Sequence, residues 1–355
     1  MRRLPGGIGR AILGVSISIV ALALVVRSVD LAAAWETLKG ADARWVALLV
    51  AFVGADVLLR ALRWRVLLAP VGRVSFGTTL SSLLVGYLAN NILPARLGEI
   101  VRSVDLGERT RLSRSTILGT IVVERVVDTV VVVAIASVAI LVLSVRGIVA
   151  SAVLVGLALT ALLVVAIAAG IAAHRLPGGE RFATYLHRWP RVRVVLVRLR
   201  EGLSIATDVR TMAGAVALSV ASWSCTVVAF AAAAQAVGVQ PTMGQAALLA
   251  AGTNLATAIP AAPGYVGTFE LAAVTIGASV GIVREDTLAF AILLHVSTLL
   301  ITSVGGAIAF ALGQRSRARR APVSVGDNGR TTDPAVADAV PSPAADEVVA
   351  RSKGA

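Results

Sequence analysis

Two groups of charged and helix-breaking residues lie within apolar sequence of the kind that crosses membranes. The first group comprises Asn90, Asn91, Pro94, Arg96, Gly98, Glu99 and Arg102, and the second comprises Glu124, Arg125 and Asp128. A charge at the middle of a membrane helix costs roughly 2.5–3.5 kcal/mol on insertion scales, so clustered ionisable groups usually line a polar cavity or a substrate path. The two groups therefore predict a transporter-like interior.

Glu124 and Asp128 are four residues apart, so they share one face of a helix, and Arg125 is close enough to reach Asp128. A face with this much charge must turn toward the protein interior. In one interpretation the carboxylates position Arg96 or Arg102, or exchange protons during transport. In the other they form a structural ion-pair lock between helices, and the spacing leaves both interpretations open.

A third stripe of charge lies earlier in the chain. Asp56, Arg60 and Arg63 recur at helical spacing within another apolar run. Arg63 and Arg65 lie near its expected end, where long side chains can extend to the membrane interface. Extension of Arg63 and Arg65 to the interface is therefore the favoured account of this stripe.

The late segment that contains Pro260, Pro263, Gly264, Gly267 and Glu270 has a similar character. Prolines remove backbone donors, and glycines let the chain bend or let another group approach closely. Glu270 would then meet an arginine of the first group or bind a proton. The alternative is a tight turn between two membrane spans.

The elements that position these residues are predicted to be membrane helices. Hydrophobic residues make up 57% of the chain and charged residues 15%, and the mean hydropathy is +0.85, outside the usual range of soluble domains. Apolar runs long enough to cross a bilayer lie at about residues 8–27, 43–64, 116–145, 148–173, 211–237 and 286–312. The sequence therefore predicts an all-α polytopic membrane protein with about six full spans.

Arginines between the spans predict the topology. They place both the N-terminus and the C-terminus in the cytoplasm, and they account for the net charge of +13 without a nucleic-acid partner. A full crossing by residues 76–93 would export the basic run from Arg96 to Arg114. We therefore predict a re-entrant hairpin there, and a second one, entering from the opposite face, at residues 243–282.

The two hairpins resemble one another in sequence. Asn91, Pro94, Gly98 and Glu99 have a looser counterpart in Asn254, Pro260, Gly267 and Glu270. Entry from opposite faces would make this an inverted repeat, an arrangement in which many transporters place a binding site near the membrane midplane. Because the spacings differ, a chance match between two segments rich in Gly and Pro is the alternative.

Three segments also resemble a known family. They are NNILPARLGEIVR at Asn90–Arg102, VERVVD at Val123–Asp128, and IPAAPGYVGTFE at Ile259–Glu270. Together they resemble the flippase-like family typified by the transmembrane domain of lysylphosphatidylglycerol synthases, over about Val46–Leu312. The resemblance implies a helical membrane domain with re-entrant elements that moves a lipid or lipid-linked headgroup between leaflets. Bifunctional members carry an aminoacyl-transferase domain after the membrane part, and about 40 residues follow the last span here, so we expect no lysyl transfer and no enzyme activity.

An anionic headgroup that crosses the bilayer needs cationic ligands inside the protein. Arg96 and Arg102 are the leading candidates, because a guanidinium can bind phosphate through two parallel hydrogen bonds. Asn91 and the broken-helix backbone would add neutral donors, and Glu99 would hold an arginine when the site is empty. The alternative is that Arg96 and Glu99 simply pair at the cytoplasmic membrane edge.

The expected partners are membrane lipids, either anionic phospholipid or polyprenyl phosphate, in a bacterial cytoplasmic membrane. The alternative function is a non-transporting subunit that binds a polyprenyl-linked sugar for a glycosyltransferase, and a homo-oligomer is also compatible with the sequence. No cofactor or metal site is predicted, since Cys225 is the only cysteine and the three histidines are scattered. His295 is expected to be a hydrogen-bonded packing residue, and a proton relay is the alternative.

The domain organisation follows from composition. We predict an integral membrane domain at residues 1–313, which includes a cytoplasmic interfacial helix at residues 177–203. We predict a disordered cytoplasmic tail at residues 314–355, because this segment is rich in Ala, Pro, Ser, Gly and Asp.

Overall fold

The computed structural model describes residues 6–93, 97–173, 208–257 and 261–320, and every regular element in these ranges is a helix. Several expectations fall outside them: the roles of Pro94, Arg96 and Pro260, the interfacial helix at 177–203, and the tail beyond residue 320. One compact unit extends to Gln314, and the next is described only through the last residues of one helix, Arg315–Arg320.

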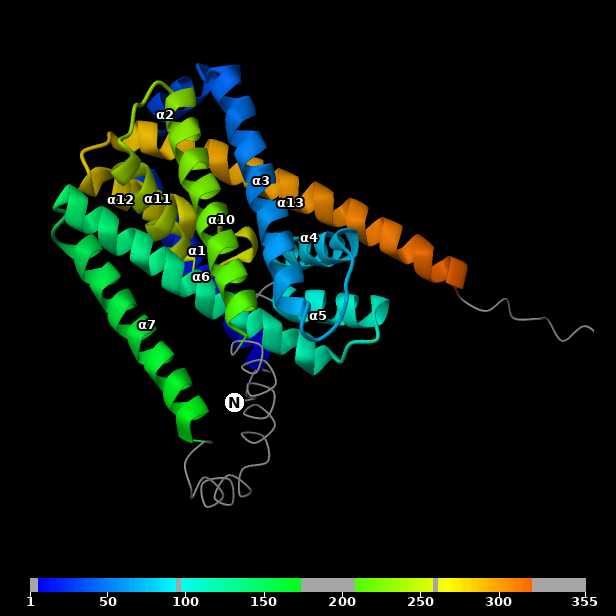
Figure 1. Cartoon of the computed structure of the whole chain (residues 1–355). Helices are drawn as coiled ribbons and strands as arrows, with labels where there is room; N and C mark the ends of the chain where they lie inside the picture. Colours follow the sequence, from blue (N-terminus) through cyan, green and yellow to red (C-terminus); the bar gives the residue numbers. More distant parts are fainter. Residues whose placement is uncertain (1–5, 94–96, 174–207, 258–260, 321–355) are drawn as a thin grey trace, which may run out of the picture. The chain divides into compact units, whose positions relative to one another are not determined.

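Each of the six predicted apolar runs forms a helix (Figure 1). They are α1 (Gly6–Ser28), α3 (Ala43–Leu68), α6 (Arg114–Leu143), α7 (Ile148–Ala173), α10 (Val209–Ala236) and α13 (Arg284–Arg320). By length and composition, α3, α6, α10 and α13 can each cross a membrane, and α1 with α2 (Leu31–Lys39), bent by 86°, would add a fifth span. The all-α polytopic fold is confirmed, with four or five candidate spans in the described residues against the six expected.

Side-chain caps mark where the helices begin. Asp42, Ser75, Ser113, Asp208 and Thr242 each accept a hydrogen bond from a backbone N–H in the first turn that follows. The first N–H groups of a helix have no partner within it, so a capping oxygen stabilises that end. These caps separate the long helices from the shorter ones described next.

The chain contains two successive sets of helices with the same order. In the first set, α3 is followed by α4 (Phe76–Ile92), a break, α5 (Gly98–Arg109) and α6. In the second set, α10 is followed by α11 (Met243–Ala256), a break that contains the 3₁₀ turn η2 (Pro263–Tyr265), α12 (Thr268–Ser279) and α13. Each half is therefore a long helix, a broken helix pair and a second long helix.

The two halves run in opposite directions. Figure 1 shows α3 and α10 side by side, and their contacts are antiparallel: the Asp42 N–H donates to the Ala236 carbonyl at 2.8 Å, while Leu67 and Ala215 share a buried cluster at the other end. Since α3 and α10 open their respective halves, this is the arrangement of an inverted repeat.

Each half also packs its broken pair against the other half. The start of α11 lies against the end of α6, where a Cβ on Gly244 would be 3.2 Å from the Leu143 side chain. Correspondingly, α4 lies against α13, where a Cβ on Gly306 would be 2.5 Å from the Leu84 carbonyl oxygen. The halves therefore interlock through equivalent helices.

The two breaks lie next to one another. In the first, the Asn90 side chain accepts a hydrogen bond from the Gly98 N–H at 2.8 Å, which joins the end of α4 to the start of α5. In the second, Gly264 and Gly267 adopt φ values of +70° and +86°, which favour glycine. A Cβ on Gly264 would lie 3.9 Å from the Asn91 carbonyl oxygen, so the breaks meet within the same region.

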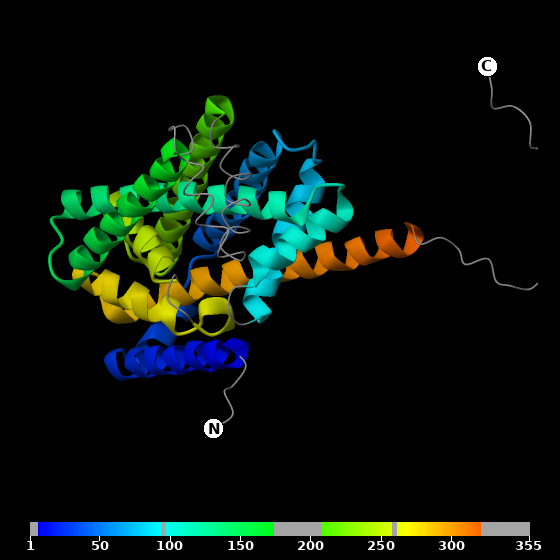
Figure 2. The ribbon, with the colours of Figure 1, turned by 90° about the horizontal axis from the view of Figure 1, so that it is seen from below.

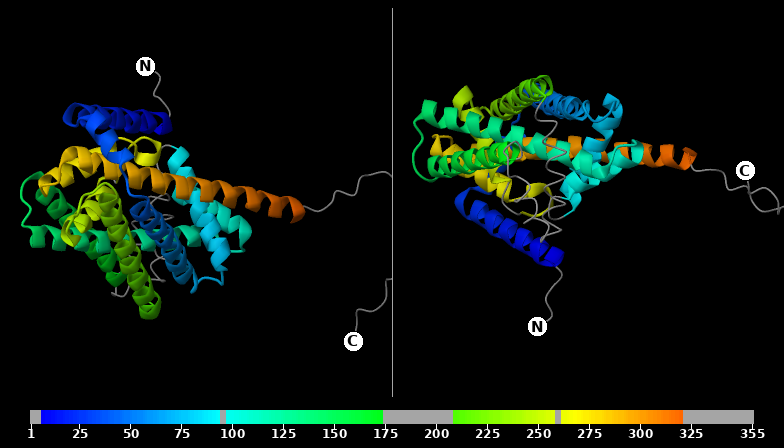
Figure 3. Two further views of the ribbon diagram at one scale, coloured as in Figure 1. Left: turned by 90° about the horizontal axis from the view of Figure 1, so that it is seen from above. Right: turned by 60° about the horizontal axis from the view of Figure 1, so that its bottom comes forward.

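Helix α1 runs along the second break and α12 (Figure 2 and Figure 3). The Ala262 N–H donates to the Ser18 hydroxyl at 2.8 Å, and a Cβ on Gly14 would lie 2.6 Å from the Ala261 carbonyl oxygen. The missing side chain of Gly14 therefore allows α1 to contact the backbone of the break directly.

Candidate functional site

Eight charged side chains, here called the network, lie together where α3, α5 and α6 meet. Ion pairs join six of them, and Arg125 with Glu99 forms a separate pair beside the six. Four are arginines and four are carboxylates, so their formal charges balance. The members are Asp56, Arg60 and Arg63 from α3, Glu99 and Arg102 from α5, and Glu124, Arg125 and Asp128 from α6. Charges inside a membrane protein are retained only when they are paired or solvated, so this balance is what makes the network tolerable.

Arg63 is at the centre of the network and is completely buried. Its two terminal nitrogens bind both carboxylates of α6: Nη2 donates to Glu124 and to Asp128 at 2.9 Å, and Nη1 donates to the other oxygen of Asp128 and to Ser219 of α10. The expectation that Arg63 extends to the membrane interface is therefore wrong. Glu124 and Asp128 lie one turn apart on α6, so they can accept hydrogen bonds from both terminal nitrogens of Arg63 at once. The membrane interface offers no such fixed pair of acceptors.

Glu124 joins three helices. One of its oxygens accepts from Arg63 of α3, and the other accepts from Arg102 Nη2 of α5 at 3.0 Å. Glu124 and Arg102 are both about 98–99% buried. Features of both interpretations are therefore present. Glu124 binds Arg102, as the positioning interpretation requires, and the same contacts connect α3, α5 and α6, as the ion-pair lock requires.

Two tryptophans complete the surroundings of the arginines. The Arg102 guanidinium lies 4.7 Å from the centre of the Trp64 ring, and that of Arg60 lies 5.4 Å from the Trp223 ring. The Trp223 indole also donates to Asp128 at 3.3 Å. A cation held over an aromatic face is attracted by the ring quadrupole, and this stabilises arginines that water does not reach.

Arg125 differs from the other arginines of the network. Its closest carboxylate, Glu99, is 3.6 Å away, and 45% of the Arg125 side chain and 26% of the Glu99 side chain are exposed. Arg125 lies 11 residues after Arg114, the first residue of α6, which is about 16 Å along the helix at 1.5 Å per residue. Arg125 also lies next to the first break, because its partner Glu99 is in the first turn of α5, which follows the break.

A second acid–base pair lies at the second break. Glu270 Oε1 is 2.6 Å from His295 Nδ1, and Glu270 Oε2 accepts from the Gly267 N–H at 2.7 Å. His295 Nε2 is 2.8 Å from the Gly264 carbonyl oxygen. Glu270 therefore pairs with a histidine and not with an arginine of the first hairpin, and His295 is hydrogen-bonded through both ring nitrogens, as expected.

The two pairs occupy equivalent positions in the two halves. Glu99 and Glu270 both lie in the first turn of the second helix of a broken pair. Arg125 lies 11 residues after the start of α6, and His295 lies 11 residues after Arg284, the start of α13. In each half, a carboxylate at the start of the second short helix thus pairs with an arginine or a histidine of the last long helix. In the first half, Arg102 and Glu124 join the same two helices as well.

Comparison with known proteins identifies the family. The family described as the lysylphosphatidylglycerol synthase TM region matches residues 11–306. The chain belongs to this family. The matched range includes both breaks and every member of the charged network, and no curated protein matches the chain. As a member of the lysylphosphatidylglycerol synthase TM-region family, the chain is a multi-pass membrane protein related to lipid handling.

The other predicted residues that the structure describes in this family member have structural roles. Asn91 donates to Thr302 at 3.0 Å and to Ser303 at 2.9 Å, so it joins α4 to α13. Gly98 packs against the backbone of Gly86, which brings α5 close to α4. Pro263, Gly264 and Gly267 all lie in the second break. Their expected roles in substrate binding or bending remain predictions.

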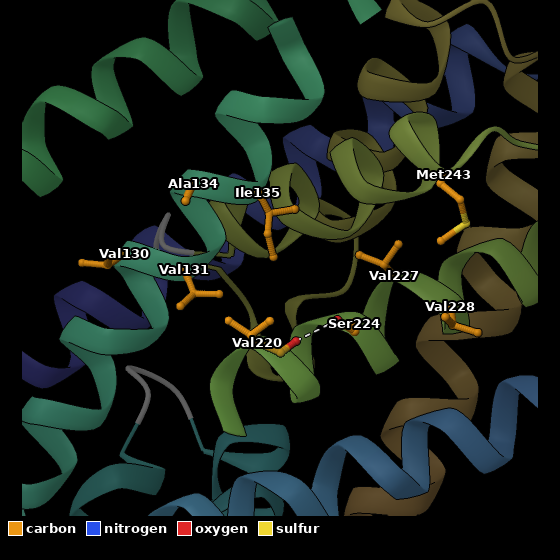
Figure 4. Close-up of a pocket in the computed structure, with 9 residues that line it drawn as sticks. All are labelled: Val130, Val131, Ala134, Ile135, Val220, Ser224, Val227, Val228 and Met243. Carbon is orange, nitrogen blue, oxygen red and sulfur yellow. Dashed lines mark hydrogen bonds between the residues drawn. The ribbon is translucent and has the colours of Figure 1, made fainter. Parts of the chain in front are cut away.

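A pocket of about 380 Å³ lies between α6 and α10 and is lined by apolar side chains (Figure 4). Its lining residues are Val130, Val131, Ala134, Ile135, Val220, Ser224, Val227, Val228 and Met243. Such a surface suits a hydrocarbon chain. It does not supply the polar cavity that the sequence led us to expect, and that cavity stays a prediction.

The sequence shows the charged stripe on α3, but it favours the membrane interface for Arg63 and not the network. Asp56, Arg60 and Arg63 recur at intervals of four and three residues, which places them on one helix face. The same rule led to Glu124 and Asp128, and it applies equally to α3. Trp64 and Trp223 carried no such signal, because an aromatic residue in an apolar helix is ordinarily a packing residue.

Proposed function

We propose that this protein binds the anionic headgroup of a membrane lipid at Arg125 and moves that lipid between the two leaflets. The observation that carries the proposal is the accessibility of Arg125 within a membrane helix, beside the first break. Because an arginine cannot be deprotonated in a protein, its charge at this depth needs a counter-charge. Glu99 supplies one only at 3.6 Å, so an incoming anion can compete.

The other arginines of the network are less suitable as first contacts. Arg63 is held by two carboxylates, and Arg102 is held by Glu124 and buried against Trp64. Arg102 nevertheless keeps two buried N–H groups without a partner in the described residues, at Nε and Nη1. Buried donors of this kind favour an acceptor, so Arg102 would add hydrogen bonds once an anion has entered beside Arg125.

The inverted arrangement of the two halves supports movement of the lipid, rather than binding alone. Transporters with inverted repeats place their sites between discontinuous helices and change access by rocking one repeat against the other. Here the two breaks meet, and the broken pairs interlock with the opposite halves. We propose an anionic phospholipid or a polyprenyl phosphate as substrate, no catalytic step, and a bacterial cytoplasmic membrane with both termini on the cytoplasmic side.

The test is leaflet exchange in liposomes that contain the purified protein. Fluorescent phosphatidylglycerol and a labelled polyprenyl phosphate serve as anionic probes, and labelled phosphatidylcholine serves as the comparison. Arg125→Gln should reduce exchange of the anionic probes by about tenfold to a hundredfold, since a hydrogen bond to a charged group contributes about 1.5–3 kcal/mol. Arg44→Gln is the matched control, because the Arg44 side chain is 90% exposed and lies outside the network.

Three outcomes separate the hypotheses. Loss of exchange in Arg125→Gln with normal exchange in Arg44→Gln supports the proposal. Exchange that is no faster with protein than without it, for both anionic probes, contradicts it. If a polyprenyl phosphate binds in an Arg125-dependent way but does not change leaflet, the protein is the non-transporting subunit of the alternative function.

A further inference from the structure

The equivalent pairs of the two halves differ in their chemistry. Glu99 and Arg125 are accessible and 3.6 Å apart, whereas the side chains of Glu270 and His295 are about 10% exposed and 2.6 Å apart. Arginine keeps its proton at any physiological pH, but histidine gains and loses one between about pH 5 and 8. The second half therefore has a proton-dependent group at the position where the first half has a permanent charge.

The hydrogen bonds of His295 determine how many protons the pair holds. The Gly264 carbonyl oxygen can only accept, so Nε2 must carry a hydrogen. The short contact between Nδ1 and Glu270 Oε1 joins two atoms that both have lone pairs, so a second proton must lie between them. The pair thus holds two protons, either as imidazolium and carboxylate or as imidazole and carboxylic acid, and both forms are neutral overall.

We propose that Glu270 and His295 form a proton-binding site whose occupancy holds the second break closed. Loss of one proton leaves a carboxylate facing a lone pair, in surroundings where neither charge nor an unpaired acceptor is well tolerated. The contact between α12 and α13 then breaks. Glu270 also accepts from the Gly267 N–H, so its movement frees the backbone that begins α12. The link between this opening and lipid movement rests on the proposed function, but the proton-dependent opening does not.

The side chains and backbone groups around Glu270 and His295 are mostly uncharged. Phe269 lies 4.5 Å from the His295 ring, and Phe230 of α10 packs on Phe269. In the described residues, α1 contributes the neutral Ser18, α4 contributes the Asn91 carbonyl, and α13 contributes Leu299 beside Gly264. Tyr265 is the other titratable side chain of the break, and a phenol ordinarily ionises near pH 10. Glu270 and His295 are therefore the groups of the break that share the exchangeable proton.

The first experiment detects the proton directly. The chain has three histidines, so replacing His174 and His187 with glutamine leaves His295 as the only imidazole signal in ¹⁵N NMR. We expect Nε2 to remain protonated over the whole range and Nδ1 to change state in a single step. In Glu270→Gln, the amide nitrogen can donate to Nδ1 while the amide oxygen accepts from Gly267, so both contacts persist without an acidic proton, and the step should disappear.

The second experiment measures opening without any lipid assay. Thr268 is 8% exposed beside the pair, so Thr268→Cys in a Cys225→Ser background reports whether a maleimide reaches the break. The same cysteine combined with Glu270→Gln corrects for the ionisation of the thiol itself. The ratio of labelling rates between these two proteins should rise by about tenfold per pH unit until the pair is deprotonated. Glu36→Gln, which removes an exposed carboxylate, should leave the pH profile unchanged.

Equal pH profiles with and without Glu270→Gln would overturn the proposal, as would a His295 ring that titrates in the same way in both proteins. The NMR measurement with native Glu270 keeps the proposal testable even if the glutamine variant fails to fold. If lipid exchange is absent but labelling depends on Glu270 as expected, only the proposed transport fails. If exchange depends on Arg125 but labelling does not depend on pH, only the proton site fails.

Discussion

Replacing Arg63 with methionine should strongly destabilise the protein, because it leaves two buried carboxylates short of a partner. Arg63 is completely buried and binds both Glu124 and Asp128. Removal of one member of a buried ion pair typically costs about 3–5 kcal/mol. Each kcal/mol lowers the melting temperature of a large domain by about 2–4 °C, so we expect a fall of roughly 6–20 °C.

The assay is thermal unfolding in detergent, followed by tryptophan fluorescence. Trp64 and Trp223 lie against the network, so their emission reports its disruption. Arg44→Met is the control, since its exposed guanidinium pairs only with the neighbouring cap Asp42 in the described residues. An exposed ion pair contributes little to stability, so Arg44→Met should melt close to the parent protein.

A second substitution tests whether charge balance is the reason. In Arg63→Met with Asp128→Asn, three arginines and three carboxylates remain, and they already lie as pairs: Arg60 with Asp56, Arg102 with Glu124, and Arg125 with Glu99. The double variant should therefore lose less stability than the sum of the single variants, by about 0.5–3 kcal/mol. Additive losses, or a melting temperature for Arg63→Met equal to that of the Arg44 control, would refute the reasoning.

Two further predictions concern the first break and a helix cap. Gly98→Ala should lower stability by about 1–3 kcal/mol in the same melting assay, because its Cβ would collide with the Gly86 carbonyl oxygen. Gly54→Ala is the control, since a Cβ there would have nothing within 4 Å. Equal effects of the two substitutions would mean that the close packing of α4 and α5 is unimportant. Hydrogen bonds from Arg44 lower the pKa of Asp42 in the folded protein. The ionised Asp42 carboxylate therefore stabilises the fold above its unfolded pKa of about 3.9, and this stabilisation is lost as the pH falls through the lower folded pKa. Asp42→Ala should therefore melt below the parent at neutral pH, with a difference that shrinks below about pH 4, and a constant difference would contradict this assignment.

Much of the fold could be predicted from the sequence, because a membrane demands long apolar helices and tolerates few exceptions. The cost of charge in a membrane likewise predicts that Glu124 and Asp128 face inward, and both are at least 95% buried. The accessibility of Arg125 could not be predicted. From the sequence, Arg96 and Arg102 are the leading ligands, and Arg125 is expected to be able to reach Asp128. The difference between Arg102 and Arg125 arises only when Glu124 and Trp64 enclose Arg102.

The second half was harder to interpret for a related reason. Glu270 and His295 are 25 residues apart, and no motif of fixed spacing contains both of them. Their pairing depends on how α12 packs on α13, which is a tertiary property. The equivalence with Glu99 and Arg125 becomes visible only when each residue is counted from the start of its helix, and helix starts cannot be read from apolar runs to better than a few residues.

The first half has Arg125 where the second half has His295, and this difference bears on the charge balance of the proposed transport. The eight groups of the network already balance, so an anion that enters beside Arg125 adds one negative charge to the interior. A permanent cation paired with Glu270 would keep the second half neutral at every pH, so it could not offset this added charge. A histidine can offset it, because Glu270 and His295 are neutral when closed and negative when open. Under the two proposals, binding an anion in the first half and a proton in the second adds no net charge, which predicts that lipid exchange and the Glu270-dependent opening share one pH dependence.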